Sequence, residues 1–268
     1  MKSMKCDKKR GGQTFKKALG ITALALLMLV SIAGASPFAY ITNGDSNNVS
    51  VIDVSTNKVI TSVSVGSNPM GVAVSPDGTK VYVGNANSNN ISVINTATNT
   101  VIAALPAGSN PMGIAVSPDG KNVYLANHLS NTVSFFDTST NNVKSTVPVG
   151  KKPTGVAVGP DGKKVYVTNE GDGTVSIIDT ATNAVTATIP VGSGPQEIAV
   201  TPDGKKVYVV NYDSGSVSVI DTAANKVTNT VNVGRAPRGV AVNPNGTKVY
   251  VTTNDEYLLL FSLLEKKL

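Results

Sequence analysis

GVAVGPDGKKVYVTNEGDGTVSIIDTATNAVTATIPVG, residues 155–192, is the stretch that determines the fold. It contains four short runs rich in Val, Ile and Thr, at residues 155–159, 164–169, 174–180 and 184–192. Within these runs apolar and polar residues alternate with a period of two, and turn residues separate the runs, as is typical of β-strands. The Pro-Asp-Gly at 160–162 and the Asp-Thr-Ala-Thr-Asn at 179–183 have the chemistry of tight turns. The stretch therefore predicts one antiparallel sheet of four strands.

This unit recurs along the chain every 42 residues, with no insertion or deletion over five periods. The tyrosines that open its second strand mark the register: Tyr40, Tyr82, Tyr124, Tyr166, Tyr208 and Tyr250. Helical repeats of this length would carry a different periodicity and a composition rich in Ala, Leu and Glu. Small residues alternate with valine in the first strand, as at Gly155 and Ala157, which suits strands that converge on an axis. A tandem array of four-stranded antiparallel sheets around an axis predicts an all-β β-propeller.

The phrases VYVTN (165–169), SPDG (75–78) and IDTATN (178–183), together with the 42-residue period, resemble the YVTN family of β-propeller repeats over residues 38–254. The resemblance implies an exported protein of archaeal or bacterial surfaces, of the surface-layer or surface-antigen type. The family usually forms seven-bladed rings, whereas residues 36–268 hold about five and a half units. We therefore expect five or six blades, in a ring that is incomplete or that combines N- and C-terminal strands.

Residues 1–35 have the composition of a secretory signal peptide. Seven Lys/Arg and one Asp in residues 1–17 precede an apolar stretch, 18–35, that ends in Ala33-Gly34-Ala35. Export with cleavage after Ala35 is predicted, and the alternative is an uncleaved membrane anchor, because about 18 apolar residues can span a bilayer. Cys6 lies in this segment, so a cleaved chain would contain no cysteine and would fold without disulfides.

The remaining chain divides into the propeller, residues 36–254, and a divergent C-terminal segment, residues 255–268. YLLLFSLL (257–264) is apolar at positions where other units carry serine, so it predicts either a buried closing strand or a surface for self-association. The net charge of +6 comes from residues 1–17, because the rest of the chain holds 16 basic and 16 acidic residues. A neutral domain lacks the basic excess that nucleic-acid binding requires.

Two sets of loops change from unit to unit, and together they form what we call the variable rim. One set follows the second strand (43–48, 85–90, 127–132, 169–174, 211–216), and the other precedes the first strand (66–70, 108–112, 150–154, 192–196, 234–238). The loops of the opposite, uniform rim hardly change. Asymmetry at the mouth of a propeller channel indicates a binding site. The candidate binding residues are Lys151, Lys152, Gln196, Glu197, Arg235, Arg238, His128, Glu170 and Tyr212.

Catalytic and metal chemistry have little support in the sequence. His128 is the only histidine, so zinc or copper sites and a Ser-His-Asp system lack the residues they need. The loops 43–47 and 211–215 alternate oxygen donors but also fit hairpin turns, which favours turns over calcium. Glu170 with Glu197 is a weak carboxylate pair for glycoside hydrolysis. No cofactor is expected.

The sequence thus favours a non-enzymatic, exported module that binds a protein or glycan of the cell envelope. Two alternatives remain open. One is a lactonase-like hydrolase at the channel mouth, which would use Glu197, Arg235 and Arg238. The other is a structural subunit of a surface array that is joined through residues 258–264. We expect the membrane to be contacted only through the N-terminal segment.

Overall fold

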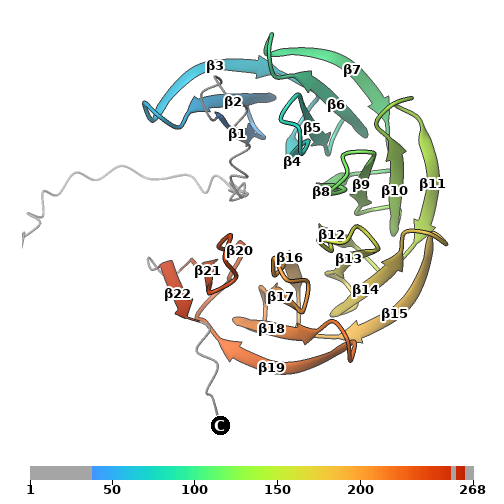
Figure 1. Ribbon diagram of the computed structural model, residues 1–268, viewed down its shortest axis with the longest axis vertical. Coiled ribbons are helices and arrows are strands. Elements are labelled where there is room, and N and C mark those ends of the chain that lie inside the picture. The colour runs from blue at the N-terminus through green and yellow to red at the C-terminus, as the bar shows by residue number, and fades with distance from the viewer. Residues whose placement is uncertain (1–37, 255–257, 263–268) are drawn as a thin grey trace, which may run out of the picture.

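The computed structural model describes residues 38–254 and the backbone of residues 258–262, and Figure 1 shows these residues as six antiparallel sheets arranged along an arc. The predicted cleavage site and residues 263–268 lie outside the described residues. Every described element is a strand, and in this part of the chain no helix is long and apolar enough to cross a membrane. The expected all-β fold of four-stranded units is confirmed.

Each sheet is built from strands that are consecutive in sequence. The first sheet has three strands, β1 (Phe38–Asn43), β2 (Asn48–Asp53) and β3 (Lys58–Ser64). The second has β4 (Pro69–Val74), β5 (Lys80–Asn85), β6 (Asn90–Asn95) and β7 (Thr100–Pro106), and the third has β8 (Pro111–Val116), β9 (Asn122–Asn127), β10 (Thr132–Asp137) and β11 (Val143–Pro148). The fourth has β12 (Pro153–Val158), β13 (Lys164–Asn169), β14 (Thr174–Asp179) and β15 (Ala184–Pro190). The fifth has β16 (Pro195–Val200), β17 (Lys206–Asn211), β18 (Ser216–Asp221) and β19 (Lys226–Asn232), and the sixth has β20 (Val240–Val242), β21 (Lys248–Thr252) and β22 (Leu258–Ser262).

The core lies between neighbouring sheets, because the second and third strands of an inner sheet bury both faces. In β13 every residue after Lys164 is buried, and Val165 and Val167 are fully inaccessible. These two valines pack with Tyr124 and Phe135 of the third sheet. Tyr124 and Phe135 meet edge to face, with ring centroids 4.6 Å apart. Fully burying a side chain of this size contributes about 1.5–3 kcal/mol, so stacking of the sheets stabilises the array.

The asparagine that ends the VYVTN motif is buried at the end of the second strand, where its side chain makes hydrogen bonds within the sheet. The Nδ2 of Asn169 donates to the Oγ1 of Thr174 and to the Oγ of Ser176, both at 2.9 Å, and so links the second strand to the third. Gly150 packs over this amide, since a Cβ there would lie 2.6 Å from the Cγ of Asn169. The asparagine therefore requires the glycine, and the same contact recurs in four units, as Gly66 with Asn85, Gly108 with Asn127, Gly150 with Asn169 and Gly192 with Asn211.

Loop chemistry agrees with the predicted turns. Gly162 has φ of 71° and Asn183 has φ of 54°, the left-handed conformation expected at the ends of these two turns. Asp179 accepts hydrogen bonds from the amides of Ala181 and Thr182 at 3.0 and 2.9 Å, which closes its own turn. Both turns belong to the uniform rim, and the Oγ1 of Thr180 joins them by donating to the carbonyl of Gly162.

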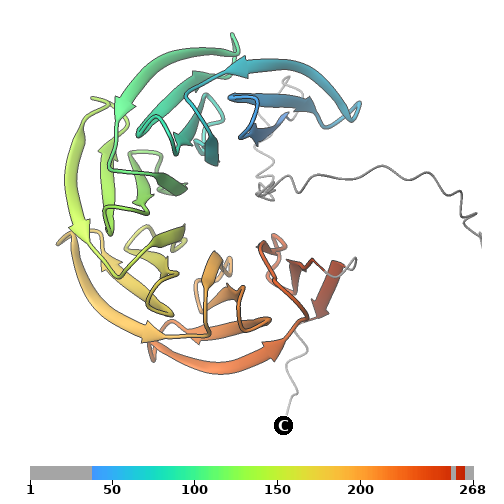
Figure 2. The same cartoon turned by 180° about the vertical axis from the view of Figure 1, so that it is seen from behind.

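The ends of the array differ from one of our expectations. Strands from the two ends do not combine into one sheet: β1–β3 and β20–β22 form separate three-stranded sheets, so six sheets are present among the described residues. Both views show the arc open between them (Figures 1 and 2). The divergent segment does supply a third strand, because Leu260 of β22 stands opposite Tyr250 of β21 in the antiparallel register. The side chains of residues 258–264, and with them the proposed contact surface, lie outside the described part.

Candidate functional site

Backbone hydrogen bonds hold the two sets of variable loops together on one rim, as predicted. In the fourth sheet the amide of Glu170 donates to the carbonyl of Lys152 at 3.0 Å, and the amide of Gly171 donates to the carbonyl of Lys151 at 3.1 Å. The fifth sheet repeats this contact between Tyr212 and Gly194 at 2.8 Å. Neighbouring sheets are also connected, because the Oδ1 of Asn131 accepts from the amide of Lys152 at 2.9 Å. The rim is therefore a connected surface whose side chains vary on a fixed backbone.

His128 and Glu170 form the first side-chain pair that crosses a sheet boundary. The Nε2 of His128 in the third sheet lies 3.5 Å from the Oε2 of Glu170 in the fourth. The same carboxylate oxygen accepts a hydrogen bond from the Oγ1 of Thr154 at 3.2 Å. The hydrogen bond with His128 is the largest of the effects that hold the pKa of Glu170 below its usual value. Thr154 is a contributor that the sequence analysis did not single out.

Lys151 and Lys152 lie beside this pair but play different parts. The amide of Lys151 donates to Asp172 at 2.7 Å, and its ammonium lies 3.9 Å from the same carboxylate. Both side chains of this ion pair are partly open to water, so the pair adds little to stability. Lys152 adopts φ of 52°, where two other units have asparagine, and its charge helps to lower the pKa of Glu170.

Tyr212 and Arg238 form the second pair, between the fifth and sixth sheets. The guanidinium carbon of Arg238 lies 4.6 Å from the centroid of the Tyr212 ring. The Nη2 of Arg238 also lies 3.2 Å from the phenol oxygen, within hydrogen-bonding distance. A guanidinium against an aromatic ring contributes about 0.5–1 kcal/mol at an open site, which favours this orientation of the ring.

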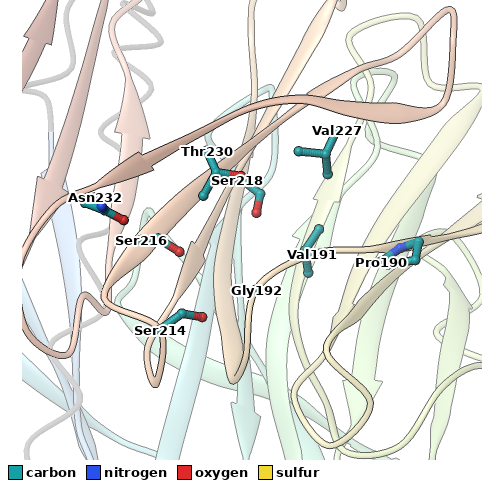
Figure 3. A pocket seen from close by; sticks show the side chains of 9 residues that line it. All are labelled: Pro190, Val191, Gly192, Ser214, Ser216, Ser218, Val227, Thr230 and Asn232. Atoms are coloured by element: carbon teal, nitrogen blue, oxygen red, sulfur yellow. The ribbon is translucent and has the colours of Figure 1, made fainter.

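Beside this pair the rim is hollowed by a recess of about 580 Å³. Its walls come from the loop 212–215, the end of β19 and the loop 234–236, and they include Arg235. A second hollow of about 350 Å³ lies between the end of β15 and the strands β18 and β19, and it shares Ser214 and Asn232 with the recess (Figure 3). There Ser214, Ser216 and Ser218 face Val191 and Val227, and none of the candidate residues takes part. The recess on the rim is therefore the hollow that coincides with the predicted site.

Gln196 and Glu197 lie on the inner strand β16, at the axis. The carbonyl of Gln196 accepts a 2.6 Å hydrogen bond from the Oγ1 of Thr168, which ties the fourth sheet to the fifth. Glu197 stands where other units have glycine, and at Gly113 and Gly155 a Cβ would lie 2.2 and 2.3 Å from a carbonyl oxygen of the next inner strand. Burial raises the pKa of Glu197 to about 7.

The inner strand that contacts β16 on the side of the sixth sheet, β20, is shorter than the other inner strands. Strand β20 spans only Val240–Val242, whereas the other inner strands have six residues and begin at the fixed proline. The exception is visible in the sequence, because four of the five units have glycine at this position and only the unit of Glu197 has another residue. Glu197 was predicted as a variable residue of the rim, and the steric consequence of replacing glycine at this position was not predicted.

The described residues contain no group of three or more His, Cys, Asp or Glu side chains that could hold a metal ion. The carboxylate of Glu170 contacts His128 and Thr154, and Glu197 lies apart from it in sequence, on the inner strand β16. What the rim offers is a set of fixed polar and aromatic groups, arranged as pairs across sheet boundaries.

Antiparallel sheets stacked along an arc, with their loops gathered into two rims, define a β-propeller, a fold that supports a binding or interaction module in general. The chain belongs to the YNCE-like beta-propeller family, whose model matches residues 73–170 and 155–247. No curated protein matches the chain.

Solved structures share the fold. Kuenenia stuttgartiensis hydrazine synthase is 28% identical, with a TM-score of 0.76 over 84% of this chain and 73% of that chain. A functionally unknown protein from Desulfotomaculum acetoxidans DSM 771 is 20% identical, with a TM-score of 0.74 over 81% of this chain and 72% of that chain. A chain of the mitotic checkpoint complex is 17% identical, with a TM-score of 0.76 over 84% and 71%. The last two likenesses concern the fold alone.

Proposed function

We propose that this chain is an exported β-propeller that acts as a non-enzymatic binding module at the cell envelope. The observation that carries the proposal is the difference between the two rims. On the uniform rim the polar contacts repeat from unit to unit: Asp179 closes its own turn, and the Nζ of Lys80 and of Lys164 donate to the carbonyls of Thr138 and Thr222 in the next sheet. On the variable rim, His128 with Glu170 and Tyr212 with Arg238 form polar pairs across sheet boundaries. Fixed, unit-specific side chains around a propeller mouth suit recognition of a partner.

Export and envelope location are supported by the sequence pattern of residues 1–35 and by the resemblance to YVTN surface proteins. The neutral charge of the remaining chain argues against a nucleic-acid partner. The proposed partner is therefore a protein or glycan of the envelope.

A saturation experiment tests this proposal. The purified chain should bind isolated envelopes of its native host saturably, and Arg235→Ala combined with Arg238→Ala should weaken binding by about tenfold or more, because both residues lie on the variable rim. Lys205→Thr is the matched control: it changes a charge on the uniform rim to the threonine that other units have at Thr79 and Thr247. Absence of saturable binding, or equal loss in the control, would contradict the proposal.

One observation favours a second candidate function, a lactonase-like hydrolase. Glu197 places a carboxyl with a pKa of about 7 near the axis, in the range suited to a general base at neutral pH. Hydrolysis of a panel of lactones by the purified chain, abolished by Glu197→Gln, would establish this activity. A rate no higher than that of buffer would eliminate it.

A further inference from the structure

The departures from the repeat concentrate at the boundary between the fifth and sixth sheets. Glu197 replaces the glycine of the inner strand, and β20 is shortened beside it. Ala236 adopts a left-handed conformation, with φ of 49°. At the equivalent positions of the other units this conformation is adopted by asparagine, lysine or glycine. Alanine in the left-handed conformation is strained, and backbone strain of this kind is typical of functional sites.

The recess of about 580 Å³ lies at this same boundary. Its volume falls within the range of small-molecule sites, roughly 300–1,000 Å³. Among its lining residues, Tyr212 and Asn232 stand where the second unit has Ala86 and Pro106. Both departures place a side chain with ligand-binding potential in the wall of the hollow.

The chemistry of the lining indicates the class of ligand. Tyr212 provides an aromatic ring that Arg238 contacts, and Asp213 and Asn232 provide a hydrogen-bond acceptor and an amide. Ser214 is part of the fixed wall, because its Oγ accepts from the amide of Ser193 at 2.6 Å. The other lining side chains are small, so the walls lack the large apolar anchors on which a peptide would depend.

A ligand that suits these walls is polar, carries several hydroxyl groups and presents one apolar face to a ring. Saccharides have this character, because their axial C–H groups stack on aromatic rings while their hydroxyls both donate and accept. Asp213 and Arg235 carry opposite charges, so the recess does not have the basic excess that a nucleic acid requires.

We propose that the recess between the loops 212–215 and 234–236 is a saccharide-binding site, with Tyr212 as its stacking platform and Asn232 and Asp213 as its hydrogen-bonding groups. The inference deepens the proposed function and rests on it, because it names the ligand class of the same rim.

Two substitutions test the site by restoring residues that other units carry. Tyr212→Ala copies Ala86, and Asn232→Pro copies Pro106, Pro148 and Pro190, so both variants keep a sequence that folds elsewhere in the chain. The full chain is applied to an array of immobilised neutral, N-acetylated and uronic-acid oligosaccharides, and the best of these is titrated by calorimetry. We expect binding that falls about tenfold or more in each variant, while Lys205→Thr leaves it unchanged. No bound oligosaccharide, or equal affinity in Tyr212→Ala, would overturn the inference.

Periodate oxidation of the envelopes separates this inference from the proposed function. Envelope binding that survives both periodate and Tyr212→Ala would overturn the saccharide site while the binding module stands. Binding to the array without binding to envelopes would support the site and contradict the proposed location.

Discussion

Replacing Gly113 with valine is expected to lower the free energy of unfolding by about 3 kcal/mol or more. A Cβ at Gly113 would lie 2.2 Å from the carbonyl oxygen of Thr154, and 3.0 Å from the Cα of Gly155, in the next inner strand. Both contacts are to backbone atoms of β12, so no flexible side chain can move aside. The inner strands must then separate, and every sheet boundary that depends on their approach is weakened.

Urea unfolding followed by circular dichroism measures this effect, and Gly84→Ala is the matched control. Gly84 lies on β5, where the third unit carries Ala126, and the tightest contact of a Cβ there would be 3.2 Å, to the flexible Cδ1 of Leu125, with the carbonyl of Met112 at an ordinary 3.6 Å. We expect the control to change stability by less than about 1 kcal/mol. If Gly113→Val prevents folding, Gly113→Ala gives a graded loss that can be measured. Wild-type stability in both Gly113 variants would contradict close packing at the axis.

The sheets and turns could be predicted because local chemistry specifies each of them and the chain repeats that chemistry. Gly162 and Asn183 end their turns in the left-handed conformation that only a few residue types adopt readily. The end of the array could not be predicted in the same way. Whether β1 joins β20 in one sheet depends on the curvature accumulated over all sheet boundaries, and no single motif encodes that curvature.

In the candidate site, too, some features could be predicted from the sequence and others depend on how the sheets are arranged. Comparison of the units located the variable rim, because the fold is constant there and only the side chains change. The pairs within the rim were not predictable, since His128 and Glu170 are 42 residues apart and meet only because neighbouring sheets bring their loops within reach. Glu197 lies between these cases: its exceptional position was visible in the sequence, while the shortened strand β20 beside it required the structure.

Glu197→Gly is expected to stabilise the protein at pH 8 by about 2 kcal/mol and to flatten the dependence of stability on pH. Burial raises the pKa of Glu197 from 4.5 to about 7, so between these values the folded chain retains a proton that the unfolded chain has lost. The wild type should therefore lose stability as the pH rises from about 4.5 to 7 and then level off. The full shift corresponds to about 3 kcal/mol at 1.36 kcal/mol per pKa unit, and partial access of water to this half-buried side chain reduces it.

Glycine at position 197 also removes a Cβ at a position where, in Gly113 and Gly155, a Cβ would lie 2.2 and 2.3 Å from the next inner strand, so we expect β20 to extend toward Pro237 as the other inner strands extend to their prolines. Urea unfolding of the wild type, Glu197→Gly and Glu197→Gln at pH 5 and pH 8 separates charge from shape. Glutamine keeps the side chain but not the charge, so it should flatten the pH dependence as glycine does while giving a smaller total gain. Because the three proteins share every other titrating group, the differences among them report on position 197 alone. An unchanged loss of stability between pH 5 and 8 in both variants would show that the Glu197 carboxyl is not the group responsible.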